Sequence, residues 1–349
     1  MTPWLVLAGA MLIAAVVTEW TRRLAIDHGL LDVPNARSSH VSATPRGGGI
    51  AIVLAVAVAG VFVVVVSPTD RVVLVWPALA GLAVAMVGLL DDRQGLSAGI
   101  RFAVHSIAAL VVLIGTARSG PLEVAGLDLD PFVAGALSWL GLVWLTNLFN
   151  FMDGIDGLAG MEGAFVSSGL ALCLYLSSGT VDRIALISMA TAGACLGFLA
   201  WNWPPAKIFM GDVGSGFLGF LLGTLGLWAV RETPLNLWVP LILLALFVTD
   251  ATVTLLRRVA RGERWYQAHR SHAYQRLSRR WGSHQSVTLT ALSINVAWLL
   301  PLAILAALRG DLGGVAAIVA YFPLVLGAII AGAGMPDGAR ASDSARSIG

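Results

Sequence analysis

Two adjacent carboxylates, Asp91 and Asp92, follow directly on a long apolar stretch of this sequence. A carboxylate at the end of an apolar helix costs free energy unless it is solvated or paired. The pair is therefore a candidate for holding a divalent cation or for acting as a general base. The alternative is a solvated helix end, although the helix dipole makes Asp unfavourable at a helix C-terminus.

A second set of polar residues repeats every three positions at the end of another apolar stretch. On a helical segment this spacing keeps the side chains on roughly one side. Carboxylate and amide oxygens are ligands for Mg²⁺, and the spacing differs from that of an EF-hand loop, whose first acidic ligands alternate at intervals of two. We predict that this stripe binds Mg²⁺ and hydrogen-bonds a polar substrate; its members are Asn147, Asn150, Asp153 and Asp156.

A polar, glycine-rich segment, residues 202–216, contains Lys207 and Asp212 and precedes a further apolar run. Its literal G-x-G-x-x-G pattern is not a dinucleotide fingerprint, because no strand or βαβ unit surrounds it. We expect the N-terminus of the following helix to attract phosphate, and we expect the same of the segment Arg46-Gly-Gly-Gly49. Close helix packing is the alternative explanation for the glycines.

Two histidines, His269 and His272, lie three residues apart in the most basic loop. They could form a zinc pair, but no third ligand is near, so we expect them to contact a diphosphate together with Arg270. The alternative for the arginines of residues 257–280 is membrane topology or contact with lipid headgroups. Asp250 falls near the end of the preceding apolar run, where an acid is a functional candidate.

The elements that position these residues must be membrane helices. Of the 349 residues, 57% are apolar and 12% are charged, whereas a soluble domain has about 25% charged residues. This excludes a soluble enzyme, a disordered chain and a coiled coil, and the apolar runs lack the alternation of barrel strands. We predict an all-α polytopic membrane protein with eleven apolar helices near residues 2–20, 47–66, 72–90, 102–118, 132–150, 161–178, 184–201, 214–230, 237–256, 286–307 and 313–333.

The ends of the chain are assigned from their charges. No positive charge precedes the first run, so we predict a retained helix and not a signal peptide. We expect one transmembrane domain, residues 1–333, and a disordered tail, residues 334–349. Cys173 and Cys195 lie inside apolar runs and are expected to be small buried residues.

Positive charge divides unequally between the two sides of the predicted bundle. Fifteen Lys and Arg residues follow odd-numbered runs, and five follow even-numbered runs. The positive-inside rule then places the loops after odd-numbered runs in the cytoplasm, with the N-terminus outside and the C-terminus inside. The five polar segments follow runs 1, 3, 5, 7 and 9. We therefore predict one shared site on the cytoplasmic face.

These motifs together resemble the polyprenyl-phosphate N-acetylhexosamine-1-phosphate transferase superfamily (glycosyltransferase family 4). The resemblance spans about residues 34–280 and is closest to the branch that begins O-antigen synthesis. Its motifs are Thr44-Pro-Arg-Gly-Gly-Gly49, Asp91-Asp92, Asn147-x-x-Asn150-x-x-Asp153-Gly-Ile-Asp156-Gly-Leu-Ala, Phe209-Met-Gly-Asp212-x-Gly-Ser and His269-x-x-His272.

The resemblance implies an activity, a cofactor and partners. Members transfer a sugar-1-phosphate from a UDP-N-acetylhexosamine to undecaprenyl phosphate, release UMP and need Mg²⁺, with Mn²⁺ as an alternative. It implies a multi-pass protein of the bacterial inner membrane in contact with the lipid bilayer, with a homodimer as one option. We expect no nucleic-acid partner.

The resemblance also implies a role for each matching residue. The metal ligands would be Asn150, Asp153 and Asp212. The catalytic acids would be Asp91, Asp92, Asp153 and Asp156, with Asp91 and Asp92 activating the lipid phosphate or binding metal. Substrate would be bound by Arg46, Asn147, Lys207, Asp250, His269, Arg270 and His272.

Two departures from the motifs of the muramyl-pentapeptide translocases bear on the substrate. Gly95 stands where those enzymes have a Lys after the acidic pair, and their run of three histidines is absent. Both departures argue against a muramyl-pentapeptide donor, which remains the alternative. A transporter is a further alternative, but its polar residues would lie at mid-helix in both halves of the bilayer.

Overall fold

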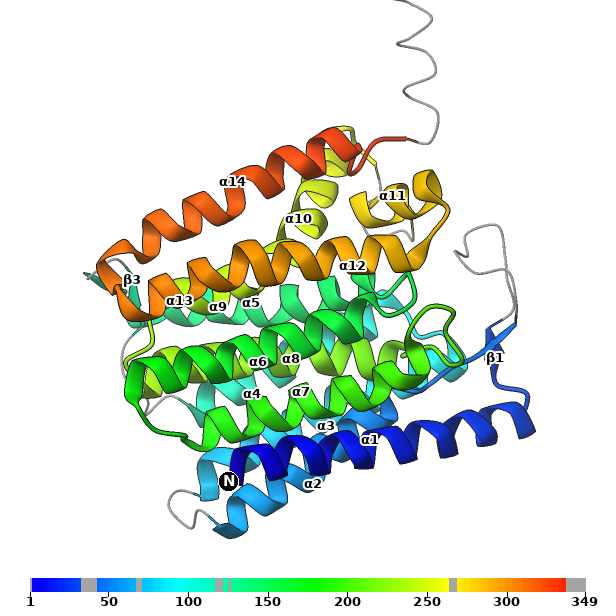
Figure 1. Ribbon diagram of the computed structural model, residues 1–349, viewed down its shortest axis with the longest axis horizontal. Helices are drawn as coiled ribbons and strands as arrows, with labels where there is room; N and C mark the ends of the chain where they lie inside the picture. Colours follow the sequence, from blue (N-terminus) through cyan, green and yellow to red (C-terminus); the bar gives the residue numbers. More distant parts are fainter. Residues whose placement is uncertain are drawn as a thin grey trace, which may run out of the picture.

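The computed structural model describes residues 2–32, 43–66, 71–116, 122–124, 127–263 and 269–336. Within these ranges the chain is a bundle of helices, in agreement with the predicted fold class (Figure 1). Residues 34–42, where the stretch that resembles the family begins, part of the basic loop (residues 264–268) and most of the predicted tail lie outside the described residues. The helices are α1 (Thr2–Asp27), α2 (Ile50–Val66), α3 (Arg71–Gln94), α4 (Ala98–Gly115), α5 (Pro131–Met152), α6 (Leu158–Ser178), α7 (Arg183–Asn202), α8 (Asp212–Glu232), α9 (Trp238–Leu243), α10 (Ala245–Ala260), α11 (Ala273–Trp281), α12 (His284–Ile294), α13 (Leu300–Leu308) and α14 (Gly313–Ala331).

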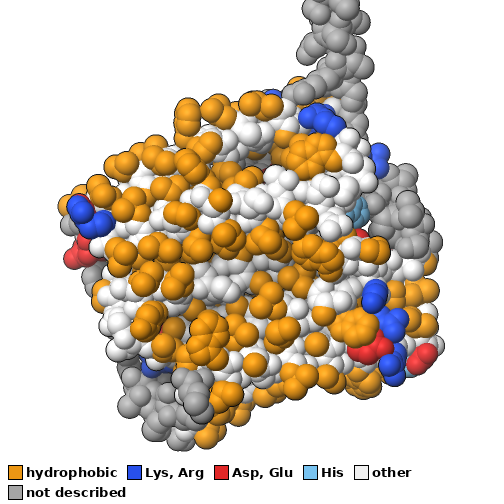
Figure 2. Space-filling view, viewed as in Figure 1, with side chains coloured by type: hydrophobic (Ala, Val, Ile, Leu, Met, Phe, Trp, Pro, Cys, Tyr) orange, Lys and Arg blue, Asp and Glu red, His pale blue; other side chains and the backbone are white. Residues whose placement is uncertain are grey.

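Nine helical segments of the described chain are long and apolar enough to cross a membrane. α2 is a shorter apolar helix, and the predicted run 237–256 is divided between α9 and α10 at Leu244. Each of the eleven predicted runs overlaps a helix or a pair of helices. In Figure 2 the charged side chains of the visible face gather toward the two ends, and the band between them consists of hydrophobic side chains, uncharged side chains and backbone. This distribution fits a multi-pass membrane protein, while the number of spans and their orientation stay predictions.

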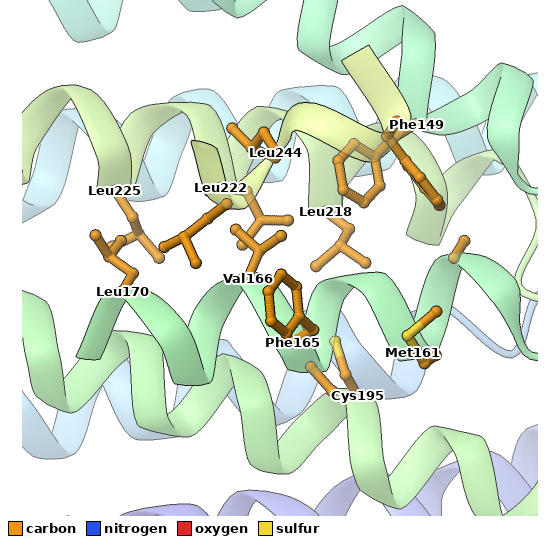
Figure 3. Close-up of a cluster of buried hydrophobic side chains, with 14 of the residues drawn as sticks. Phe149, Met161, Phe165, Val166, Leu170, Cys195, Leu218, Leu222, Leu225 and Leu244 are labelled. Carbon is orange, nitrogen blue, oxygen red and sulfur yellow. The ribbon is translucent and has the colours of Figure 1, made fainter. Parts of the chain in front are cut away.

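The centre of the bundle is formed by α6 and α8. Of their apolar stretches 83% is buried, against 28% for α1 and α14, which therefore lie at the periphery. Figure 3 shows Phe165 and Leu218 of these two helices packed together beside Cys195 of α7. Both cysteines are free and buried, as predicted.

The helix that runs from His284 to Leu308 is interrupted by a π-helical turn, Asn295–Leu299. Pro301 follows this turn, and it has no N–H for the carbonyl one turn earlier, which favours such an irregularity. The turn places Asn295 against α6, where its amide donates to the buried Glu162 carboxyl over 2.6 Å.

Two pairs of very short antiparallel strands complete the described structure: β1 (Leu31–Asp32) with β2 (Thr44–Pro45), and β3 (Glu123–Val124) with β4 (Leu127–Asp128). β1 and β2 come between α1 and α2 in the sequence. They lie at the end of the bundle where α11 also lies (Figure 1). As far as they are described, the polar segments predicted to share a site come to this end, as the following contacts show.

Candidate active site

The start of α8 is held by the acidic pair at the end of α3. The Asp92 carboxylate accepts hydrogen bonds from the backbone N–H groups of Asp212, over 3.0 Å, and Val213, over 3.1 Å. Gly88 lets α3 come this close, because a Cβ there would lie 2.4 Å from the Asp212 carbonyl oxygen. Asp92 is thus the helix cap of α8, contributed from another helix.

The glycines in front of α2 pack against the same segment. The N–H groups of Gly48 and Gly49 donate to the carbonyls of Phe209 and Met210, over 2.9 and 2.8 Å. A Cβ at Gly49 would lie 2.3 Å from the Cα of Gly214.

The prediction that amides at these two helix starts bind phosphate is therefore wrong for the four N–H groups just described, which donate to protein acceptors. Close packing, the alternative explanation of the glycines, is correct here. Arg46 lies at the same end of the bundle, largely exposed, with its guanidinium 3.4 Å from Asp32. Its contact with substrate stays a prediction.

A cluster of charges surrounds the Asp212 side chain. The Asp91 and Asp212 carboxyl groups lie close to each other. Arg101 of α4 lies between them, with its Nη1 2.5 Å from Asp91 and 3.5 Å from Asp212. The sequence does not mark Arg101 as a functional residue, because the positive-inside rule alone explains an arginine in a cytoplasmic loop.

The end of α5 brings the Asn/Asp stripe to this cluster. Asn150 donates to the Ser215 hydroxyl over 3.3 Å, and its side chain also contacts Asp212. Asp153 ends the helix, and its pKa is raised well above the usual range, first by burial and then by the charges of Asp212, Asp92 and Asp156. Several carboxylates that repel one another in a buried site are stabilised by a bound cation.

The other two members of the stripe have different surroundings. Asn147 donates to the Val143 carbonyl of its own helix over 2.7 Å, so its contact with a nucleotide stays a prediction. Asp156 accepts from the Ala206 N–H over 3.0 Å and lies 3.2 Å from His284 Nδ1. His284, at the start of α12, was missed because a single histidine far along the chain has no motif to mark it.

Asp156 thereby ties the turn after α5 to α12 and to the segment that contains Lys207. The Lys207 ammonium lies over the Trp201 ring, 5.3 Å from the ring centroid. The Arg22 guanidinium of α1 lies 5.6 Å from the same ring. Lys207 is exposed at this corner of the bundle, and its predicted contact with substrate stays a prediction.

The histidine loop, residues 269–272, is supported by Asp250. This carboxylate is 6% exposed and accepts from His272 Nδ1 over 3.3 Å and from the N–H groups of Ala273 and Tyr274 over 2.8 and 2.9 Å. Asp250 caps α11 and holds His272. The structure thus gives Asp250 a supporting role in this loop, and its predicted contact with substrate stays a prediction.

The two histidine rings stack, with their centroids 4.9 Å apart. His269 Nδ1 is 3.1 Å from the Ser271 hydroxyl. Burial, then the charges of His272 and Arg258, lower the pKa of His269 to about 4, so the ring is neutral at pH 7. The Tyr274 hydroxyl donates to the Phe151 carbonyl over 2.8 Å and so joins this loop to the end of α5. Arg270 is half-buried beside the histidines, and its substrate role stays a prediction.

The donor set around Asp212 fits Mg²⁺ better than zinc. It offers carboxylate and amide oxygens, and Mg²⁺ is held by one or two carboxylates together with waters and substrate phosphates. Across the described ranges no three acidic, histidine or cysteine side chains already form a metal site. The residues that would hold Mg²⁺ are Asp212, Asn150 and Asp153, with Asp91 in contact.

Comparisons with known proteins agree with the family resemblance that the sequence motifs indicate. The model of glycosyl transferase family 4 matches residues 74–230. A probable undecaprenyl-phosphate N-acetylglucosaminyl 1-phosphate transferase of Bacillus subtilis is 32% identical, covering 77% of this chain and 75% of that protein. A decaprenyl-phosphate N-acetylglucosaminephosphotransferase of Mycolicibacterium smegmatis is 34% identical, covering 80% and 76%. A phospho-N-acetylmuramoyl-pentapeptide-transferase of Heliobacterium modesticaldum is 32% identical, covering 72% and 80%.

Proposed function

Because this chain belongs to glycosyl transferase family 4, within the polyprenyl-phosphate N-acetylhexosamine-1-phosphate transferase superfamily, we propose that it transfers N-acetylhexosamine-1-phosphate from a UDP-sugar to undecaprenyl phosphate. An oxygen of the lipid phosphate attacks the phosphorus that carries the sugar. A new P–O–P bond forms, the bond to the UMP oxygen breaks, and UMP leaves.

The observation that carries this proposal is the oxygen-rich cluster of Asp91, Asp212, Asn150 and Asp153 at one end of the bundle. Mg²⁺, when bound, would neutralise charge on the diphosphate during transfer. Arg101 adds a fixed positive charge beside Asp91 that is suited to a phosphate oxygen. The gathering of these side chains at one end favours an enzyme of a membrane surface over a transporter. We place this end at the cytoplasmic face of the bacterial inner membrane, from the asymmetry of Lys and Arg.

The donor is proposed to be a UDP-N-acetylhexosamine for O-antigen or a related envelope glycan. Gly95, which replaces the translocase Lys, has φ +67° and donates its N–H to the Asp91 carbonyl over 2.9 Å. The position therefore serves as a left-handed helix end, where a lysine would be strained. UDP-MurNAc-pentapeptide is the alternative donor, because a phospho-N-acetylmuramoyl-pentapeptide-transferase is also among the similar proteins.

An assay of purified protein with undecaprenyl phosphate, Mg²⁺ and a panel of UDP-sugars tests this proposal. We expect UMP release with at least one UDP-N-acetylhexosamine, loss of turnover when EDTA removes divalent metal, and no turnover of UDP-MurNAc-pentapeptide. Comparable rates with the pentapeptide nucleotide would contradict the donor assignment. Release of UMP from none of the nucleotides would contradict the function.

An apolar cavity beside the histidine loop supports a prenyl acceptor. It has a volume of about 220 Å³ and lies among α5, α6, α10, α11, α12 and α14. Met152 and Leu158, on either side of the turn that contains Asp153, line this cavity, and so does Asp250, which supports the histidine loop. Tyr274, Ala291 and Gly327 are among its other lining residues. We propose that part of the prenyl chain lies here.

Filling this cavity is expected to weaken acceptor binding. Gly327 lines the cavity, and a Cβ there would meet nothing within 4 Å, so Gly327→Leu adds volume without a clash at that atom. Displacing one or two methylene groups of the lipid, each worth about 0.8 kcal/mol, should raise the KM for undecaprenyl phosphate roughly four- to fifteenfold. A short-chain prenyl phosphate should be affected less.

The control is Gly9→Leu in α1, where a Cβ also meets nothing within 4 Å. The KM for the UDP-sugar should stay unchanged in both variants. An unchanged KM for undecaprenyl phosphate in Gly327→Leu would remove the acceptor from this cavity.

A further inference from the structure

The turn that follows α14, residues 332–335, is bonded to arginines of α10 and α11. Arg257 donates to the Ala333 carbonyl and Arg276 to the Met335 carbonyl, each over 3.0 Å. Arg261, just after α10, donates to the Gly334 carbonyl. The basic residues here thus have a definite structural task beyond membrane topology. We name residues 332–335 the C-terminal clasp.

The clasp reaches the histidine loop directly. The Gly334 N–H donates to the Ser271 carbonyl over 2.7 Å. Ser271 lies between the two histidines, next to His272, and its hydroxyl is 3.1 Å from His269 Nδ1. The loop is therefore fixed from two sides, by Asp250 at its His272 end and by the clasp at Ser271.

The sequence of the clasp suits its position. Gly334 has φ +71°, and a Cβ there would lie 2.8 Å from the Thr254 carbonyl oxygen. Ala333 has no exposed surface and packs in a small cluster with Ala273, Ala328 and Ala331. A larger residue at either position requires α10 and α14 to separate.

We propose that the C-terminal clasp positions the histidine loop for the UDP-sugar, with Arg276 and Gly334 as positioning residues. His269 is the half-buried contact of this loop, and His272, which is 3% exposed, supports it from behind. The proposal rests on the proposed function for the identity of the donor. The carboxylate cluster stands on α3, α5 and α8, whereas the clasp bonds to α10, α11 and Ser271. Loosening the clasp should therefore act on donor binding more than on the chemical step.

Two variants separate this role from general stability. Gly334→Val introduces both strain and a clash, and Arg276→Met removes one donor while keeping a long side chain. Each should raise the KM for the UDP-sugar roughly tenfold, the size of one or two lost hydrogen bonds, with kcat nearly unchanged. Arg276→Lys should restore most of the affinity, because an ammonium can also donate to the Met335 carbonyl.

Gly179→Val is the matched control. Gly179 has φ +69°, so valine there is strained to the same degree, but a Cβ would meet nothing within 4 Å. Its KM for the UDP-sugar should equal that of the wild type. An unchanged KM in Gly334→Val and Arg276→Met, or a fall in kcat at constant KM, would overturn the proposal.

Hydrogen exchange supplies a readout that is independent of activity. In Gly334→Val the amides of residues 271–274 should exchange faster than in the wild type, because the loop opens more easily. Unchanged exchange would overturn the clasp even if no UDP-sugar were turned over. If these amides exchange faster in Gly334→Val while the wild type turns over no UDP-sugar, the clasp stands and only the proposed donor is removed.

Discussion

Replacing Asp212 with Asn is expected to reduce transferase turnover by more than a hundredfold, roughly 3 kcal/mol or more of transition-state stabilisation. The substitution keeps the shape of the side chain and removes the charge that would bind Mg²⁺. No Mg²⁺ concentration should restore activity. The protein should remain folded in the membrane, and its thermal midpoint should not fall, because one of several mutually repelling, half-buried carboxylates is lost.

The structure removes the main competing explanation for Asp212. A helix-capping Asp would cost about 0.5–2 kcal/mol of stability when lost and leave the chemistry intact. The cap of α8 is provided by Asp92, and the N-cap residue itself is Gly211, which has no side chain to accept a bond.

The control is Asp182→Asn at the start of α7, where the carboxylate does cap its own helix by accepting from the Ala185 N–H over 2.8 Å. Turnover should stay close to that of the wild type in this variant. If Asp212→Asn keeps more than about a tenth of wild-type turnover, a loss under ~1.4 kcal/mol, the metal must be assigned to Asp91 or Asp153 instead.

Asp92→Asn is expected to lower both stability and activity. Both carboxylate oxygens accept N–H groups of α8, and an Asn offers only one oxygen there while its amide nitrogen faces a donor. Leaving one buried N–H unsatisfied costs about 1–3 kcal/mol. The thermal midpoint should therefore fall, in contrast to Asp212→Asn, and differential scanning fluorimetry in the absence of Mg²⁺ measures the difference.

The activity of Asp92→Asn should also respond differently to metal. Because Asp92 positions the backbone that carries Asp212, its loss should weaken Mg²⁺ binding, and high Mg²⁺ should restore part of the turnover. A stable variant without activity at any Mg²⁺ concentration would contradict the positioning role and would return Asp92 to the reacting groups.

The helices and the grouping of the polar residues could be predicted from the sequence. Long apolar runs in lipid favour helices, because a helix satisfies its backbone groups within one segment. Most predicted runs agree with the observed helices to within four residues at each end, whereas α1 continues seven residues beyond its run and the run 237–256 is divided at Leu244. The parity of the polar segments predicted their common end, because successive crossings of a membrane alternate sides. The spacing of Asn150 and Asp153 likewise predicted that they share a side, because residues three apart on one helical segment lie on the same face.

The hydrogen-bonding partner of each polar group, in contrast, depends on how the helices pack in the folded protein. The Asp92 carboxylate meets α8 across 120 residues of sequence, and Asp156 meets His284 across 128. Neither partner can be found from local spacing, because such contacts depend on how whole helices pack. The same holds for Arg101, which membrane topology alone would explain until its guanidinium is seen between two carboxylates. The glycines before α2 looked suited to phosphate, but the N–H groups of Gly48 and Gly49 donate instead to the carbonyls of Phe209 and Met210 in the segment packed against them.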